Sequence, residues 1–137
     1  MKKYNHAVQY YETDKMGITH HSNYVRWMEE ARLFCLKDIG CDFLEIEKKN
    51  IVSPVLSIDC AYKKTTTYGD TIEIEVVIKE FKGVKLKLEY IMRNEQGEEV
   101  CRGSSLHCFL NDKGMPIRFA KEFPELYDTL MSYVNHE

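Results

Sequence analysis

An aspartate lies in a short loop directly ahead of the first predicted helix. Residues 10–24 read YYETDKMGITHHSNY, so Asp14 stands in the loop and the helix begins near Ser22 or Asn23, either of which can cap it. Free backbone N–H groups and the positive dipole end at a helix N-terminus can stabilise an oxyanion. A carboxylate nearby can act as a nucleophile or as a general base toward water. This arrangement is suited to acyl transfer; the plain alternative is that Asp14 is only a turn residue or cap.

The same segment resembles the signature of the 4-hydroxybenzoyl-CoA thioesterase-type hot-dog family, which includes the acyl-CoA thioesterases associated with the Tol-Pal system. The positions that match the signature are Glu12, Asp14, Gly17, His21 and Tyr24. The similarity extends through Arg32, and the later turn at residues 68–70, followed by an alternating strand, also resembles the family. The resemblance implies a long helix wrapped by a curved antiparallel sheet.

The resemblance also implies an activity, namely hydrolysis of an acyl-CoA thioester to a carboxylic acid and free CoA. Asp14 is then the general base or nucleophile, and the backbone near His21, at the helix entrance, polarises the thioester carbonyl. CoA enters as part of the substrate, and no metal or other cofactor is implied. The family further implies a homodimer or homotetramer with sites near the subunit boundary. Lys15 and Met16 stand where many relatives carry small residues, which leaves the acyl preference open.

Other residues are candidates for substrate binding. Gly17 is best explained by a positive φ or by close approach of the substrate. Tyr24 is expected to pack under the helix and shape the pocket, and the role of the His21 side chain stays open. Lys63 and Lys64 either meet CoA phosphates as point charges or form a solvated strand end. His20 and His21 are adjacent and lack a third ligand, so a metal site is not expected.

Two further functions stay open beside hydrolysis. One is an acyl-thioester hydratase or dehydratase, although the loop resembles that of thioesterases better. The other is a non-catalytic acyl-CoA-binding protein, because a fold alone does not fix a function.

Hydrophobic periodicity predicts the elements that must position Asp14. A helical apolar stripe follows the loop, and Arg32 is expected on the polar face with Phe34 on the apolar one. Later segments alternate apolar and polar residues, as in half-buried strands, and two tight turns predict an antiparallel meander. We expect strands at 4–11, 55–64, 72–79, 84–93 and 100–110, a short helix or turn at 42–49, a helix ending near Gly40 and another at 124–134. The fold class is α+β with about five strands.

Composition sets the remaining bounds. The 137 residues fit a single domain, 1–137, and 44% are hydrophobic, enough for a core. A formal charge of -3 argues against a nucleic-acid binder that relies on bulk positive charge. Five cysteines without a C-x-x-C pair predict reduced core residues rather than disulfides or zinc. The sequence shows no secretory apolar region and no run of about 20 apolar residues, so we expect a cytoplasmic protein without membrane insertion.

Overall fold

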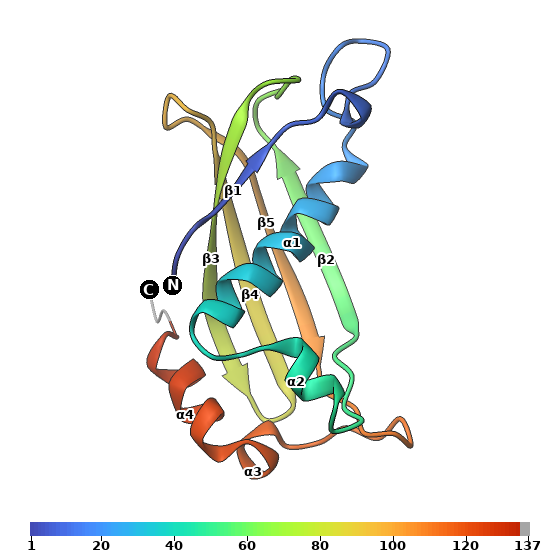
Figure 1. Ribbon diagram of the computed structural model, residues 1–137, viewed down its shortest axis with the longest axis vertical. Coiled ribbons are helices and arrows are strands. Elements are labelled where there is room, and N and C mark those ends of the chain that lie inside the picture. Colours follow the sequence, from blue (N-terminus) through green and yellow to red (C-terminus); the bar gives the residue numbers. More distant parts are fainter. Residues whose placement is uncertain (135–137) are drawn as a thin grey trace.

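The computed structural model describes residues 1–134 and contains one five-stranded sheet with a long helix across one face (Figure 1). The strands are β1 (Tyr4–Ala7), β2 (Val55–Tyr62), β3 (Thr71–Lys82), β4 (Lys85–Arg93) and β5 (Glu99–Cys108). Their order in the sheet is β1-β3-β4-β5-β2, and all neighbours are antiparallel. The predicted α+β arrangement and the meander β3-β4-β5 are confirmed.

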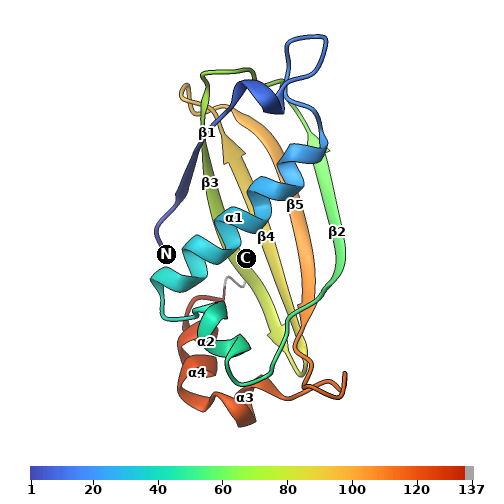
Figure 2. The same ribbon diagram turned by 45° about the vertical axis from the view of Figure 1, so that its right-hand side comes forward.

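The helix α1 (Ser22–Asp38) packs on the concave side of the sheet, which curves around it (Figure 2). Alternation in β3 and β4 directs one apolar row toward α1, where Ile72, Ile74 and Leu88 are fully buried. Trp27, Met28 and further apolar residues of α1 complete this core. The helix therefore owes its position to burial of one stripe against the sheet.

Three shorter helices gather at the end of the sheet away from the loop that carries Asp14 (Figure 1). They are α2 (Phe43–Glu47), α3 (Phe119–Glu122) and α4 (Pro124–Ser132). The predicted short helix at 42–49 and the helix near the C-terminus are confirmed, whereas α3 was not predicted. Among residues 1–134, no helix is long and apolar enough to cross a membrane.

Several details of the first predicted elements were wrong. The strand expected at 4–11 ends at Ala7, and a 3-10 turn, Tyr10–Glu12, follows because the Glu12 side chain turns into the interior. Neither Ser22 nor Asn23 caps α1, since His21 occupies the N-cap position without a side-chain cap. The end of the helix is as expected, with Gly40 at a φ of +97°.

The two faces of α1 also differ from the prediction at two positions. Arg32 is buried, with 8% of its surface exposed, because its guanidinium lies beside the hydroxyl of Tyr90 in the sheet. Phe34 is 45% exposed, and its ring packs at a tilt against the ring of Tyr4, with 5.4 Å between the centroids. The stripe is therefore wider toward Arg32 than the apolar pattern alone indicated.

Candidate active site

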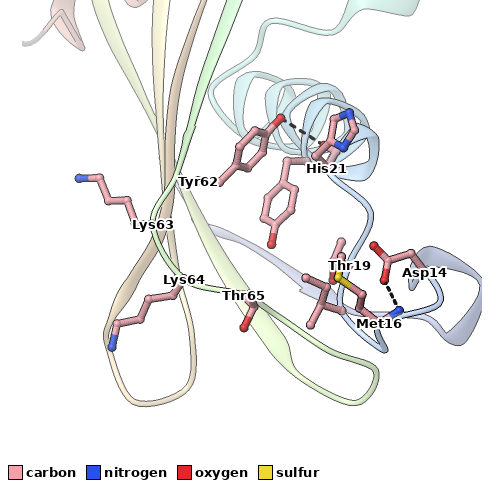
Figure 3. A pocket seen from close by; sticks show the side chains of 10 residues that line it. Asp14, Met16, Thr19, His21, Tyr62, Lys63, Lys64 and Thr65 are labelled. Carbon is pink, nitrogen blue, oxygen red and sulfur yellow. Dashed lines mark hydrogen bonds between the residues drawn. The ribbon is translucent and has the colours of Figure 1, made fainter.

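The loop that carries Asp14 is a tight turn held by its own backbone. The Asp14 Oδ1 atom accepts a hydrogen bond from the Met16 N–H at 2.8 Å, and the Asp14 carbonyl accepts one from the Gly17 N–H at 3.0 Å. Gly17 has a φ of +79°, which confirms the positive φ expected there. The half-buried carboxylate of Asp14 lines a pocket and faces its interior (Figure 3).

Glu12 fixes the base of this loop from beneath. Its carboxylate, 4% exposed, accepts hydrogen bonds from the Gln9 N–H at 2.8 Å and from Trp27 Nε1 at 2.6 Å, and it meets His6 Nε2 at 2.7 Å. Burial by itself raises the pKa of Glu12, but these three partners outweigh burial and hold the pKa below its usual value. Glu12 is therefore a buried, ionised anchor.

The opposite wall of the pocket is the start of α1. The N–H groups of His20 and Ser22 have intramolecular acceptors, whereas the N–H of His21 has none among the described residues. The His21 carbonyl accepts a hydrogen bond from the Tyr62 hydroxyl at 3.3 Å. Burial and the neighbouring Cys60 raise the pKa of Tyr62 to about 12, which keeps this hydroxyl protonated as the donor. The His21 N–H is thus held at the helix start and is free to bind an oxygen atom.

A group of buried hydroxyls lies at the base of the pocket, where Tyr24 and Thr19 line it and Thr66 joins them from outside the lining. Tyr24 and Thr66 lie 3.0 Å apart at their oxygens, and Thr66 and Thr19 lie 2.6 Å apart. The Tyr24 ring also packs on Trp27, at 4.7 Å, and on Tyr62, at 5.1 Å between centroids. Burial raises the pKa of the Tyr24 hydroxyl, so it stays neutral and structural. The predicted packing of Tyr24 under the helix is confirmed.

The pocket encloses about 320 Å³ and lies between the loop, the start of α1 and the end of β2. Its lining residues are Asp14, Met16, Ile18, Thr19, His21, Tyr24, Tyr62, Lys63, Lys64 and Thr65. Five of the six residues singled out from the sequence are therefore together, and Gly17 lies just outside, with its carbonyl held by the Thr67 hydroxyl at 2.7 Å. Tyr62 and Thr19 gave no signal in the sequence, because they reach the pocket only through folding.

The two lysines border the pocket with their stems, while their ammonium groups turn away from Asp14 (Figure 3). Lys63 pairs with Glu99, and Lys64 pairs with Glu98. The hydrogen bonds from Arg102 and Lys63 lower the pKa of Glu99 to about 2. These pairs are exposed, and such pairs contribute little to stability, so an anionic ligand can compete for the lysines at small cost.

The arrangement supports attack on a polarised carbonyl. Asp14 supplies a carboxylate, and His21 at the start of α1 supplies a backbone N–H without an acceptor among the described residues, and both residues line the same pocket. Within residues 1–134, no group of three or more His, Cys, Asp or Glu side chains is placed to hold a metal ion. All five cysteines are free thiols, as predicted from their spacing.

Comparisons with known proteins show what the chain is similar to. Residues 8–128 match the family model described as the thioesterase-like superfamily. YneP of Bacillus subtilis (strain 168), named as a candidate acyl-CoA thioesterase, is 40% identical over 119 residues, covering 86% of each chain. The structure of a DHNA-CoA thioesterase from Staphylococcus aureus superposes with a TM-score of 0.91 at 29% identity, over 95% of this chain and 88% of that one. The BH1999 gentisyl-coenzyme A thioesterase gives a TM-score of 0.83 at 26% identity, over 93% and 99%.

Proposed function

Because the chain belongs to the thioesterase-like superfamily and has its hot-dog fold, we propose that it hydrolyses an acyl-CoA thioester to a carboxylic acid and free CoA. The observation that carries the proposal is the shared pocket of Asp14 and the start of α1. The signature at residues 12–24 supports a place near the 4-hydroxybenzoyl-CoA thioesterase-type enzymes within the superfamily.

Asp14 begins the reaction in this mechanism. Its Oδ1 atom is engaged by the Met16 N–H, which orients the carboxylate, and Oδ2 is the oxygen that we assign to the chemistry in the pocket that Asp14 lines. The carboxylate either attacks the thioester carbon or takes a proton from a water molecule that does so. In the first route CoA leaves as the thiolate, and water then hydrolyses the anhydride between the acyl group and Asp14, which regenerates the carboxylate. In the second route water adds directly to the carbonyl carbon, and the proton that Asp14 removes is returned to the departing sulfur. Both routes consume one water molecule and give a carboxylic acid and free CoA.

The start of α1 stabilises the charge that develops during attack. The tetrahedral intermediate carries its negative charge on the former carbonyl oxygen, and the free His21 N–H is the donor that we assign to it. The positive dipole end of the 17-residue helix α1 adds to this stabilisation. The imidazole of His21 packs on the ring of His20 at 4.3 Å, so the proposal uses the backbone of His21 rather than its side chain.

The acyl group occupies the pocket, and the CoA part lies toward Lys63 and Lys64 in this proposal. A volume of about 320 Å³ is at the small end for ligand pockets, so it fits a compact acyl group. The rings of Tyr24 and Tyr62 suit an aromatic acyl group, and two of the structural relatives are named for DHNA-CoA and gentisyl-coenzyme A. We therefore propose that aromatic acyl-CoAs are hydrolysed faster than long straight-chain ones.

Self-association completes the proposal. The edge strand β2 has no buried residue, and Leu56, Ile58 and Tyr62 on it are each more than two-fifths exposed. An unpaired, apolar edge of this kind needs a partner strand or a cover. We propose that a second copy of the chain pairs there, so that the pocket beside Tyr62 lies near the subunit boundary in a homodimer or homotetramer.

The direct test is to incubate the protein with a panel of aromatic and straight-chain acyl-CoAs and to measure both products by chromatography. Chromatography is preferred to a thiol reagent because the chain has five free cysteines of its own. Equal release of CoA and carboxylic acid supports hydrolysis. Formation of a hydrated or dehydrated acyl-CoA would favour the hydratase alternative, and binding without turnover would favour a non-catalytic acyl-CoA-binding protein.

A further inference from the structure

The buried Glu12 lies outside the pocket and contacts β1, α1 and the loop that carries Asp14. We infer that Glu12 is a positioning residue, which sets the separation between the Asp14 carboxylate and the His21 N–H. The inference rests on the proposed function, because it concerns the same site. Glu12 itself does not line the pocket and is not expected to touch the substrate.

The side chain of Glu12 connects three segments. Oε1 accepts the Gln9 N–H at 2.8 Å and meets His6 Nε2 of β1 at 2.7 Å, while Oε2 accepts Trp27 Nε1 of α1 at 2.6 Å. The Glu12 carboxylate is therefore fixed between strand β1 and helix α1. Charge-assisted hydrogen bonds of this length are among the stronger ones in proteins.

The backbone of Glu12 closes the catalytic loop. Its carbonyl oxygen accepts the His20 N–H at 2.8 Å and the side-chain amide of Asn23 at 2.9 Å. Asp14 lies two residues after Glu12, and His21 follows His20 directly. Both ends of the loop thus depend on one residue, and a shift of Glu12 moves the carboxylate and the oxyanion donor relative to each other.

Only a carboxylate satisfies the donors around this side chain. Three N–H groups point at its two oxygens, and an ionised carboxylate accepts without donating. Glutamine has nearly the same shape, but its NH₂ group must face either the Gln9 N–H or the Trp27 N–H. His6 is itself shared, since its Nδ1 atom lies 3.3 Å from Glu30 and the Tyr4 hydroxyl donates to Glu30 at 2.9 Å. His6 therefore lies between the exposed Glu30 and the buried Glu12.

A purely structural role for Glu12 makes a different prediction from a positioning role. If Glu12 only stabilises the core, Glu12→Gln lowers the melting temperature and leaves the folded enzyme fully active. If Glu12 positions the loop, kcat falls about 10- to 100-fold in the folded variant, because displacement of reacting groups by about 1 Å costs up to about 10²-fold. KM should stay near the wild-type value, since every residue that lines the pocket is kept.

Two readouts make the experiment specific. Trp27 is the only tryptophan, so its single indole N–H signal in a ¹H–¹⁵N spectrum reports the bond to Glu12 directly. Ser105→Ala is the matched control, because Ser105 is buried and bonded to Tyr90 at 2.7 Å and to His107 at 2.6 Å without lining the pocket. The control should lower the melting temperature and keep kcat, whereas Glu12→Gln should shift the indole signal and lower kcat.

A milder variant covers the case in which Glu12→Gln does not fold. His6→Phe keeps a ring against Trp27, where the His6 ring lies at 4.6 Å, and removes the imidazole contacts with Glu12 and Glu30. The bonds from the Gln9 N–H and Trp27 Nε1 to Glu12 remain. We expect a smaller loss of kcat with KM again unchanged. The inference would be overturned by wild-type kcat in folded Glu12→Gln whose Trp27 indole signal has shifted, or in folded His6→Phe, which lacks the His6 contact with Glu12. A wild-type protein that hydrolyses no thioester would instead refute the proposed function. The positioning role can be tested in that case too, because unchanged amide signals for residues 13–21 in Glu12→Gln would overturn it.

Discussion

Replacing Asp14 by asparagine tests the reaction that we assign to this pocket. Asparagine has nearly the same shape, and its Oδ1 atom can still accept the Met16 N–H that holds the turn at 2.8 Å. The change therefore removes the ionisable carboxylate and little else. Asparagine and aspartate serve about equally well in such turns. Any large effect on turnover must then come from the lost base or nucleophile.

The two expected magnitudes are far apart. Stability should change by at most about 0.5 kcal/mol, because Asp14 is half-buried and its one side-chain bond survives. For a domain of this size, that corresponds to a melting-temperature shift of about 2 °C. Turnover should fall by about 10²- to 10⁴-fold, which is the usual contribution of a general base. The loss of activity thus exceeds what the loss of stability can explain.

The assay measures CoA release by chromatography at saturating acyl-CoA, beside thermal unfolding of the same samples. Asp112→Asn is the matched control, because it removes the same charge from an exposed turn outside the pocket. Asp14→Ala separates the turn from the chemistry, since it also loses the acceptor for Met16 and should be less stable than Asp14→Asn. A folded Asp14→Asn protein that hydrolyses its best substrate at near the wild-type rate would refute the mechanism.

Three more predictions concern assembly, metal independence and pH. Sedimentation at micromolar concentration should show a dimer or larger species, and Ile58→Lys on the exposed edge should shift it toward monomer; a wild-type monomer would contradict a site at the subunit boundary. Activity should survive EDTA and thiol alkylation, and reversible loss that a metal restores would contradict the mechanism. Burial and nearby Arg32 lower the pKa of His107 to about 4 in the folded protein, so only the unfolded chain takes up this proton between about pH 6.5 and pH 4. Stability should therefore fall by about 3 kcal/mol across that window as the pH decreases, and His107→Gln should show a shallower fall in chemical denaturation.

The sequence predicted the elements whose pattern is local. Alternation in β3 and β4 and the helical stripe of α1 depend on which face of each element is buried, and that periodicity is written in neighbouring residues. The early elements were harder because their boundaries depend on distant contacts. Glu12 ends the first strand by turning inward to Trp27, which lies 15 residues further along the chain.

The same distinction applies to the site. Asp14, Gly17 and His21 lie within one eight-residue stretch, so a local motif could indicate them. Tyr62 comes from the far strand of the sheet, and Thr66 meets Thr19 across 47 residues of sequence. No periodicity in a single segment encodes such meetings, because they result from the packing of α1 against the sheet.

Tyr62 links the exposed edge strand β2 to the pocket. Tyr62 ends the edge strand β2, and its hydroxyl donates to the carbonyl of His21, the residue whose N–H we assign to the oxyanion. The strand that is open to pairing therefore also fixes one wall of the pocket. A second chain that pairs along β2 would restrict Tyr62 and, through it, the start of α1. Oligomer formation and turnover should then weaken together in edge variants such as Ile58→Lys, although Ile58 does not line the pocket. If Ile58→Lys gave a folded monomer with wild-type kcat, β2 pairing would be separable from catalysis and the site would be complete within one chain.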